Sequence, residues 1–321
     1  MDVYLGIDVG SVTTKCALVT DRAELIAYNY LRTQGRPVAV VQQGLRELQG
    51  QIPADVRIRG VCTTGSARYL AGVIVGADVV KNEITTQSMA ALHYVPDVRT
   101  VIEIGGQDSK FIVIRDGMVV DFAMNTVCAA GTGSFLDQQA SRLNMRIEDF
   151  GELALQSGKP VHIAGRCTVF AESDMINKQQ MGYQVEDIIC GLCQALVRNY
   201  LNDVGQGKEI QPPIVFQGGV AFNKGIIRAL EESLGTKLII PPHHEITGAF
   251  GAALIAREEV PCNSEASSFK GFEMSEAHYC MSSFECQACP LLCDVAQLSL
   301  DDRVIACWGG RCDLGERIEN G

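Results

Sequence analysis

The feature that most constrains the fold is an internal repeat. Residues 7–15 (IDVGSVTTK) align without a gap onto residues 102–110 (IEIGGQDSK), and the two copies start 95 residues apart. In each copy an apolar strand ends in an acidic residue and a glycine turn. A second apolar run follows, and a third begins after a polar turn, at Leu25 and at Met118. Each copy therefore predicts a three-stranded antiparallel meander.

Helical periodicity intervenes between the strands of both halves. Apolar residues recur at i, i+3 and i+4 spacing in six segments: 38–48, 84–92, 135–143, 185–201, 225–234 and 249–257. Two strand-plus-helix halves of similar plan predict a duplicated α/β body. Because binding sites favour the interface between domains, we expect a ligand between the halves.

Charge and hydropathy exclude several classes of protein. The chain has 38 acidic residues against 27 Lys and Arg, a net charge of −11, which argues against nucleic-acid binding. Its longest apolar stretch, 71–80, is interrupted by Gly76 and Asp78 and is shorter than the roughly 18 residues of a spanning helix. The acidic start lacks the basic and apolar regions of an export signal, so we expect a cytoplasmic protein with no membrane partner.

Cysteine usage divides the chain. Seven of the 13 cysteines follow residue 260, after a polar stretch typical of a linker, so we predict a body over 1–260 and a tail over 261–321. The tail is too small for its own hydrophobic core, and we expect a metal centre to fold it. The predicted ligands are Cys286, Cys289, Cys293 and Cys312, with Cys280 or Cys307 as replacements. Zinc and an iron–sulfur cluster both accept four cysteines, and buried free thiols or disulfides are the alternatives.

The first repeat has the chemistry of a phosphate site. Gly10 permits a tight turn, and the residues after it offer amides, hydroxyls and an ammonium group to phosphate oxygens. These residues are Ser11, Val12, Thr13, Thr14 and Lys15. Asp8 at the strand end repels phosphate but can hold the waters of a bound Mg²⁺.

Two further glycine turns extend this site. In the second repeat Glu103 replaces Asp8, the turn contains Gly105 and Gly106, and either Gln107 or Asp108 is placed to orient an attacking water. A third strand ends in a glycine pair before a helix, which suits close approach to adenosine; this element contains Gly218, Gly219 and Asn223. Each turn alone is compatible with an ordinary tight turn.

The ordered set resembles the acetate-kinase, sugar-kinase, Hsp70 and actin superfamily, which has a ribonuclease H-like fold. Its first phosphate motif corresponds to 6–15, its second to 102–110 and its adenosine motif to 214–223. A helix containing Gly248, Gly251 and Ala252 also matches. The resemblance implies a two-lobed ATPase that binds ATP or ADP with Mg²⁺ between its lobes.

Two further cysteines, Cys128 and Cys167, each stand just ahead of a helical run. A helix N-terminus carries partial positive charge and free N–H groups, which stabilise thiolates and an anionic cluster. Two thiolates fill half of a four-thiolate shell, and a pair from each of two identical chains completes it. The alternative is that each is a small buried hydrophobic residue. Cys190 and Cys193 share the apolar face of a helix, so we predict packing for them.

Segments 128–133 and 167–173 closely resemble the activator ATPases of 2-hydroxyacyl-CoA dehydratases, and the resemblance covers residues 3 to about 257. It implies a homodimer with one [4Fe-4S] cluster shared by Cys128 and Cys167 of both subunits. It also implies that ATP drives an electron onto an iron–sulfur acceptor, either a dehydratase or a double-cubane cluster protein. Glu103 departs from the pattern, because the activators commonly show aspartate there.

If the protein acts as the activator ATPases do, a ferredoxin or flavodoxin supplies the electron. Gly131, Thr132 and Gly133 follow Cys128 and are expected where the nucleotide state reaches the cluster. Two other functions stay open. One is a small-molecule kinase, such as an acetylglucosamine kinase, in which Cys128 and Cys167 are packing residues. The other is a cluster-bearing regulatory module without turnover.

Overall fold

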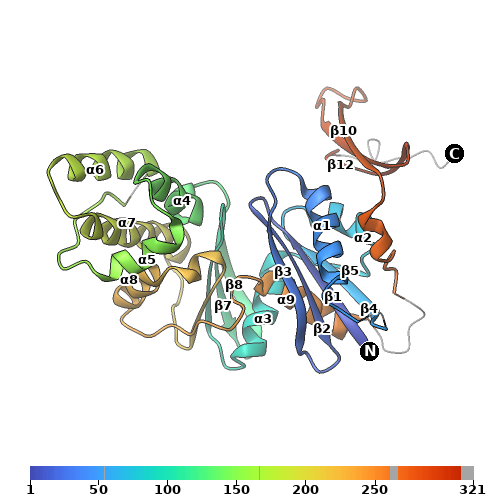
Figure 1. Ribbon diagram of the computed structural model, residues 1–321, viewed down its shortest axis with the longest axis horizontal. Coiled ribbons are helices and arrows are strands. Elements are labelled where there is room, and N and C mark those ends of the chain that lie inside the picture. The colour runs from blue at the N-terminus through green and yellow to red at the C-terminus, as the bar shows by residue number, and fades with distance from the viewer. Residues whose placement is uncertain (54, 166, 261–266, 312–321) are drawn as a thin grey trace.

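The computed structural model describes residues 1–53, 55–165, 167–260 and 267–311. Two lobes lie side by side, and a small third sheet lies beyond the first lobe (Figure 1). We call the lobe with the N-terminal strands lobe I and the lobe with the larger group of helices lobe II. Cys312, a predicted tail ligand, lies outside the described residues.

Lobe I is built on a five-stranded sheet. In sheet order its strands are β3 (Leu25–Arg32), β2 (Thr13–Thr20), β1 (Asp2–Val9), β4 (Arg57–Thr64) and β5 (Val79–Val80). β1 pairs antiparallel with β2 and parallel with β4, and every residue of β1 after Asp2 is buried. This central position explains its continuous apolar run.

Lobe II repeats the same plan with four strands. In sheet order they are β8 (Met118–Asn125), β7 (Ser109–Arg115), β6 (Thr100–Ile104) and β9 (Ile214–Gln217). β6 pairs antiparallel with β7 and parallel with β9, as β1 does with β2 and β4. The third strands begin at Leu25 and Met118. The predicted pair of meanders is confirmed.

Helices form in all six segments with helical periodicity. They are α1 (Pro37–Gln49), α3 (Glu83–Tyr94), α4 (Gly133–Arg142), α7 (Val185–Tyr200), α8 (Lys224–Leu234) and α9 (Thr247–Glu259). A further helix, α6 (Thr168–Gln180), follows Cys167 as predicted, and α2 (Arg68–Val75) and α5 (Ile147–Leu155) complete the set in the described ranges. None of these helices is long and apolar enough to cross a membrane.

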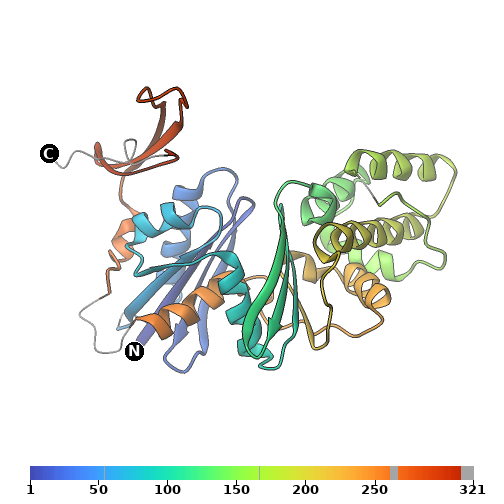
Figure 2. The same cartoon turned by 180° about the vertical axis from the view of Figure 1, so that it is seen from behind.

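Helices α3 and α9 lie between the two sheets in both views (Figures 1 and 2). The helix α9 returns from lobe II and packs so closely on β1 that a Cβ at Gly6 would lie 1.9 Å from the carbonyl oxygen of Ala249. A Cβ at Gly251 would meet the carbonyl oxygen of Thr86 on α3 at the same distance. Glycine at these two positions permits the close crossing that brings the ends of β1 and β6 together.

The described tail consists of a short 3-10 turn, η4 (Phe272–Ser275), and an antiparallel sheet of β10 (Tyr279–Glu285), β11 (Asp294–Leu300) and β12 (Arg303–Trp308). It packs on lobe I, where Leu298 is fully buried in the same apolar cluster as Leu45. Gln42 of α1 donates hydrogen bonds to the carbonyl oxygens of Met274 (3.0 Å) and Ala277 (2.8 Å). Lobe I thus supplies an apolar surface against which the tail packs.

Candidate active site

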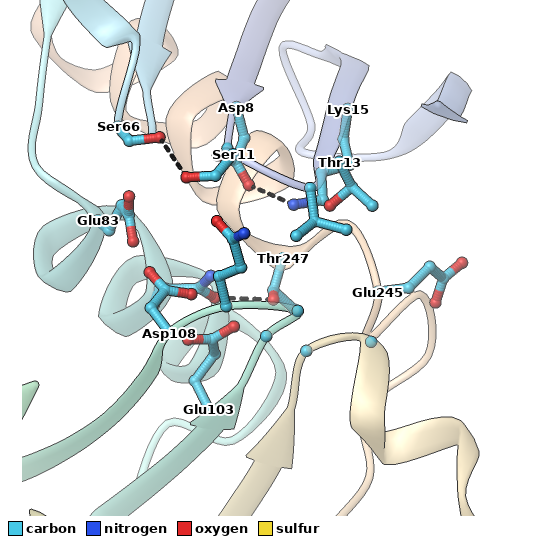
Figure 3. A pocket seen from close by; sticks show the side chains of 18 of the residues that line it. Asp8, Ser11, Thr13, Lys15, Ser66, Glu83, Glu103, Asp108, Glu245 and Thr247 are labelled. Atoms are coloured by element: carbon cyan, nitrogen blue, oxygen red, sulfur yellow. Dashed lines mark hydrogen bonds and ion pairs between the residues drawn. The ribbon is translucent and has the colours of Figure 1, made fainter. Parts of the chain in front are cut away.

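The glycine turns of both repeats face each other across a small polar cavity. Figure 3 shows Asp8, Ser11 and Lys15 of lobe I on one side and Glu103 and Asp108 of lobe II on the other. The predicted residues that line the cavity are Asp8, Gly10, Ser11, Val12, Thr13, Lys15, Glu103, Gly105, Gly106, Gln107, Asp108, Gly218 and Gly219. The structure therefore brings together all four predicted catalytic residues and three separate glycine turns.

Each repeat places an acidic residue opposite a lysine. The strand register pairs Asp8 with Lys15 and Glu103 with Lys110, and the side chains form ion pairs at 3.0 and 2.9 Å. Lys110, whose side chain is only 2% exposed, also contacts the carboxylates of Glu83 at 2.6 Å and Asp108 at 2.7 Å. With Glu245, five carboxyl groups and two ammonium groups line the cavity, so it has an excess of negative charge when all are ionised.

Burial and Lys110 set the protonation of these carboxyl groups. Burial raises the pKa of Glu103 to about 7, although Lys110 acts to lower it. Burial also raises the pKa of Glu83. For Asp108 burial acts in the same direction, but the ion pair with Lys110 outweighs it and lowers the pKa. Asp108 is therefore ionised at neutral pH, whereas Glu103 is protonated in part of the molecules.

A second, larger and more apolar cavity shares Val12, Gly105, Gly106 and Gly219 with the first. Its lining includes Leu136, Ile147, Val220, Phe222 and the predicted residues Gly133 and Asn223. The Asn223 Oδ1 accepts a hydrogen bond from the Ile226 N–H at 3.1 Å, whereas its buried Nδ2 has no protein partner in the described residues. An apolar slot with a free amide donor beside a phosphate cradle suits a nucleoside.

Three predicted binding residues do not line either cavity. Thr14 alternates with Thr13 and Lys15 along β2, so its hydroxyl faces inward and lies 3.0 Å from that of Thr33. Thr132 is buried, and its hydroxyl donates to the carbonyl oxygen of Ala129 at 2.9 Å. Gly131 packs against the backbone of Tyr200. These three residues shape the surrounding structure and do not face the cavities.

Sequence reasoning missed part of the lining: Tyr30, Ser66, Glu83, Gln87, Lys110, Glu245 and Thr247. Lys110 had a signal, because it aligns with Lys15 in the repeat. Glu83 and Gln87 come from α3, and Thr247 from the start of α9. They reach the cavity through the crossing of these helices, which no local motif indicates.

Cys128 and Cys167 are both solvent-exposed. Cys128 caps the short turn η1 (Ala129–Gly131), which leads into α4, and Cys167 is the N-cap of α6. Val127 next to Cys128 is 94% exposed, and Phe170 in the first turn of α6 is 62% exposed. Both predicted positions ahead of helices are confirmed, and both thiols are accessible.

The other cysteines of the body differ. Cys190 and Cys193 are buried in the core of lobe II, as predicted. Burial raises the pKa of Cys16 and of Cys62 to about 12, so these thiols are protonated at neutral pH.

In the tail, Cys286, Cys289 and Cys293 lie at the hairpin between β10 and β11. The Cys286 N–H donates to the carbonyl oxygen of Cys293 at 2.8 Å and closes this loop. Cys280 and Cys307 lie in β10 and β12. Within the described ranges, no three His, Cys, Asp or Glu side chains come together in a way that could hold a metal ion.

Comparison with known proteins identifies the family. The model of the BadF/BadG/BcrA/BcrD ATPase family matches residues 5–256. The chain belongs to this ATPase family. The (R)-2-hydroxyglutaryl-CoA dehydratase activating ATPase of Acidaminococcus fermentans is 37% identical over 261 residues, which are 80% of this chain and 98% of the relative.

Solved structures show the same relationship. The A. fermentans (R)-2-hydroxyglutaryl-CoA dehydratase component A has a TM-score of 0.75 and 35% identity, over 81% of this chain and 99% of that one. The activator of 2-hydroxyisocaproyl-CoA dehydratase from Clostridium difficile with bound ADPNP has a TM-score of 0.74 and 30% identity, over 82% and 100%. The two-lobed actin-like and Hsp70-like ATPase fold expected from the motifs is confirmed.

Proposed function

We propose that this protein hydrolyses ATP between its lobes and uses the cycle to deliver a low-potential electron to a partner iron–sulfur enzyme. The observation that carries the proposal is the combination of two features in one chain. A polar cavity is formed by the three nucleotide motifs, and two accessible cysteines stand at the starts of helices beside lobe II. The names of the relatives, which activate acyl-CoA dehydratases, support this combination of ATPase and partner enzyme.

The donor set of the cavity fits Mg²⁺ with a triphosphate. Carboxylate oxygens are preferred ligands of Mg²⁺ and of its bound waters, and the excess negative charge around Asp8 suits a cation. Mg²⁺ bound there would neutralise charge on the phosphates. We assign Asp8 to hold the ion through its waters, and Lys15 with the amides of the first turn to hold phosphate oxygens.

We propose that Gln107 orients the attacking water. It is exposed and lines the cavity, so its amide is available to a water molecule. Asp108, the other candidate, is engaged by Lys110 at 2.7 Å. For the nucleoside we propose the apolar cavity, with the free Nδ2 of Asn223 as a donor to the base or ribose.

The two exposed thiols fit an iron–sulfur centre. Each precedes a helix start, where partial positive charge stabilises thiolate, and exposed apolar side chains adjoin both. A [4Fe-4S] cluster bound by them would supply a one-electron carrier. Since one chain provides two thiolates, Cys128 and Cys167 from each of two copies complete the shell in a symmetric homodimer. We propose a ferredoxin or flavodoxin as donor and a dehydratase-like or double-cubane cluster protein as acceptor.

Solvent exposure argues against the kinase alternative. In a small-molecule kinase on this scaffold, Cys128 and Cys167 would have no role beyond packing, and packing cysteines are buried. Cys190 and Cys193 show what such residues look like in this fold.

For the tail, we propose a unit separate from the ATPase body, since α9 ends at Glu259 and the sheet of β10 to β12 follows. The loop closed by Cys286 and Cys293 brings three cysteines to one end of that sheet. We propose that they bind zinc or an iron–sulfur centre together with Cys312.

Anaerobic native mass spectrometry of the full chain tests the proposal. We expect a dimer with one cluster in addition to any metal in the tails. Cys128→Ala and Cys167→Ala should each remove that cluster and weaken the dimer, whereas Cys190→Ala, a change at a buried cysteine, should retain it. A cluster on a monomer, or a cluster that survives both changes, would contradict the bridging arrangement. An iron-free protein that phosphorylates a small molecule would favour the kinase.

A further inference from the structure

The start of α4 is hydrogen-bonded directly to the second phosphate turn. The N–H of Gly133 donates to the carbonyl oxygen of Gly105 at 2.8 Å. The N–H and the hydroxyl of Ser134 both donate to the carbonyl oxygen of Gly106, at 2.7 and 2.5 Å. Since Gly105 and Gly106 line both cavities, a shift of this turn acts on the first turn of α4.

The same turn also holds the other end of the segment that carries Cys128. Asn125 is paired with Ser109 in the β7–β8 ladder, directly after Asp108. Its Oδ1 accepts from the Cys128 N–H at 2.9 Å, and its Nδ2 donates to the Cys128 carbonyl oxygen at 2.7 Å. The segment 125–134 is thus fixed at both ends to residues 105–109, and Cys128 lies between these attachments.

The segment before Cys167 is held in place by different hydrogen bonds. It is held to the helices of lobe II, because Ala164 donates to Asp174 at 2.8 Å and Arg198 donates to the carbonyl oxygen of Ile163 at 2.6 Å. In the described residues, the hydrogen bonds and ion pairs of α6 with other elements include none with the phosphate turns. α6 is instead connected to α4 through Glu172, which forms an ion pair with Arg142 at 2.8 Å and accepts a hydrogen bond from Gln138 at 3.3 Å.

We propose that α4 carries the nucleotide state to both thiols through two positioning residues. Ser134 connects the second phosphate turn to α4, and Glu172 connects α4 to the helix that begins at Cys167. Cys128 is reached directly and Cys167 only through Glu172. α4 contacts both the second phosphate turn and α6, and a rigid helix with contacts at both sites can transmit a change from one to the other. This inference rests on nucleotide binding in the proposed function, but it does not require the cluster.

The test uses full-length, cluster-free protein. Alkylation rates of Cys128 and Cys167 by iodoacetamide are measured by peptide mass spectrometry, with saturating Mg·ADP and with a non-hydrolysable Mg·ATP analogue. For each thiol the readout is the ratio of its two rates. In the wild type we expect both ratios to differ from one by about two- to tenfold, the range that corresponds to one hydrogen bond.

The variants separate the two connections. Ser134→Ala removes one of the hydrogen bonds to the turn and keeps those of the backbone, so it should bring both ratios closer to one, and Ser134→Thr, which keeps the hydroxyl, should restore them. Glu172→Ala should bring the Cys167 ratio close to one and leave the Cys128 ratio unchanged; Arg142→Ala tests the same link from the α4 side. Ser141→Ala on α4 and Glu186→Ala on α7 are controls, because neither side chain makes a hydrogen bond or an ion pair with the described residues.

Nucleotide affinity is measured by calorimetry on the same samples. It distinguishes failure of the proposed function from failure of this inference. If the wild type binds no nucleotide, the proposed function fails. If it binds both nucleotides but neither thiol responds, the inference fails. Unchanged ratios in Ser134→Ala, or an equal loss at both thiols in Glu172→Ala and Arg142→Ala, would also overturn it.

Discussion

An acidic residue and a lysine pair across the hairpin in both repeats, but the two pairs have different surroundings. In the described chain the ion pairs of Asp8 are limited to Lys15, whereas Glu103 shares Lys110 with Glu83 and Asp108. Burial also raises the pKa of Glu103 to about 7, so this carboxyl is protonated in part of the molecules at neutral pH and binds a cation less well. The surroundings therefore favour Asp8 as the residue that holds Mg²⁺.

Replacing Asp8 by asparagine removes this charge and leaves the backbone amides of the first turn intact. We expect ATP hydrolysis in Asp8→Asn to fall by about 100-fold or more, the order seen when one electrostatic stabiliser is lost from an active site. Nucleotide binding should change little. Steady-state ATPase assays and calorimetric titration with ADP measure the two effects separately.

Two further variants serve as comparisons for Asp8→Asn. Asp97→Asn, at an exposed position, should hydrolyse ATP at the wild-type rate. Glu103→Gln should lose less activity than Asp8→Asn. Hydrolysis by Asp8→Asn near the wild-type rate would remove Asp8 from the site.

The raised pKa of Glu103 predicts a pH dependence of stability in protein free of nucleotide and metal. Because burial raises this pKa to about 7 from its ordinary value of 4.5, the folded state binds the proton more tightly than the unfolded state does. The resulting stabilisation is full below pH 4.5 and is lost as pH rises through 7. Glu103→Gln lacks this loss. Between pH 5 and 8 its free energy of unfolding should therefore fall by about 1 to 3 kcal/mol less than that of the wild type. Urea denaturation across that range measures it, and equal pH slopes would refute it.

At the residue scale, the sequence motifs predicted those cavity residues that belong to the glycine turns at strand ends. The three glycine turns and the four acidic or amide side chains between them reach one cavity because each follows a strand end. Glu83 and Thr247 arrive from helix starts distant in sequence, and helix crossing is a tertiary property. Thr14 was misplaced because residues alternate sides along a strand, and its hydroxyl is turned toward Thr33.

At the scale of elements, the spacing of apolar residues predicted the two meanders and six helices, because in these elements the apolar residues are the buried ones. Two short helices, α2 and α5, were not identified. The packing of the tail was also missed, since it depends on a contact between Leu298 and a cluster formed more than 200 residues earlier in the chain. Alternation within β11 gives no indication of which surface it covers.

The Leu298 contact provides a test of how the tail is held. Leu298→Ala should lower the free energy of unfolding by about 2 to 5 kcal/mol, or release the tail sheet from lobe I, because it removes a fully buried side chain. Hydrogen exchange of β11 amides should accelerate in this variant. Ser299→Ala, at the adjacent half-buried position, should leave exchange unchanged. Protection of β11 that is identical in Leu298→Ala would indicate that a metal, and not lobe I, orders the tail.

At the scale of the whole molecule, duplication explains why the site lies where it does. Both lobes end their central strands at the same cleft, so the turns of β1–β2 and β6–β7 oppose each other (Figure 3). The segment with Cys128 follows the end of β8 at this cleft, and its hydrogen bonds return to the second turn and the start of β7. The second glycine turn and the Cys128 segment are therefore close neighbours, although their motifs are separate in the sequence.

The central claim is that the nucleotide state alters an electron carrier held by Cys128 and Cys167. Its most direct test is the electron paramagnetic resonance spectrum of the reduced full-length protein, recorded with Mg·ADP and with Mg·ATP. Cys128→Ala serves as the background for any tail centre. We predict a signal that is absent in Cys128→Ala and differs between the two nucleotides, because the phosphate turn and the thiol segment are hydrogen-bonded to each other. A signal that persists in Cys128→Ala, or one identical with ADP and ATP, would contradict the account.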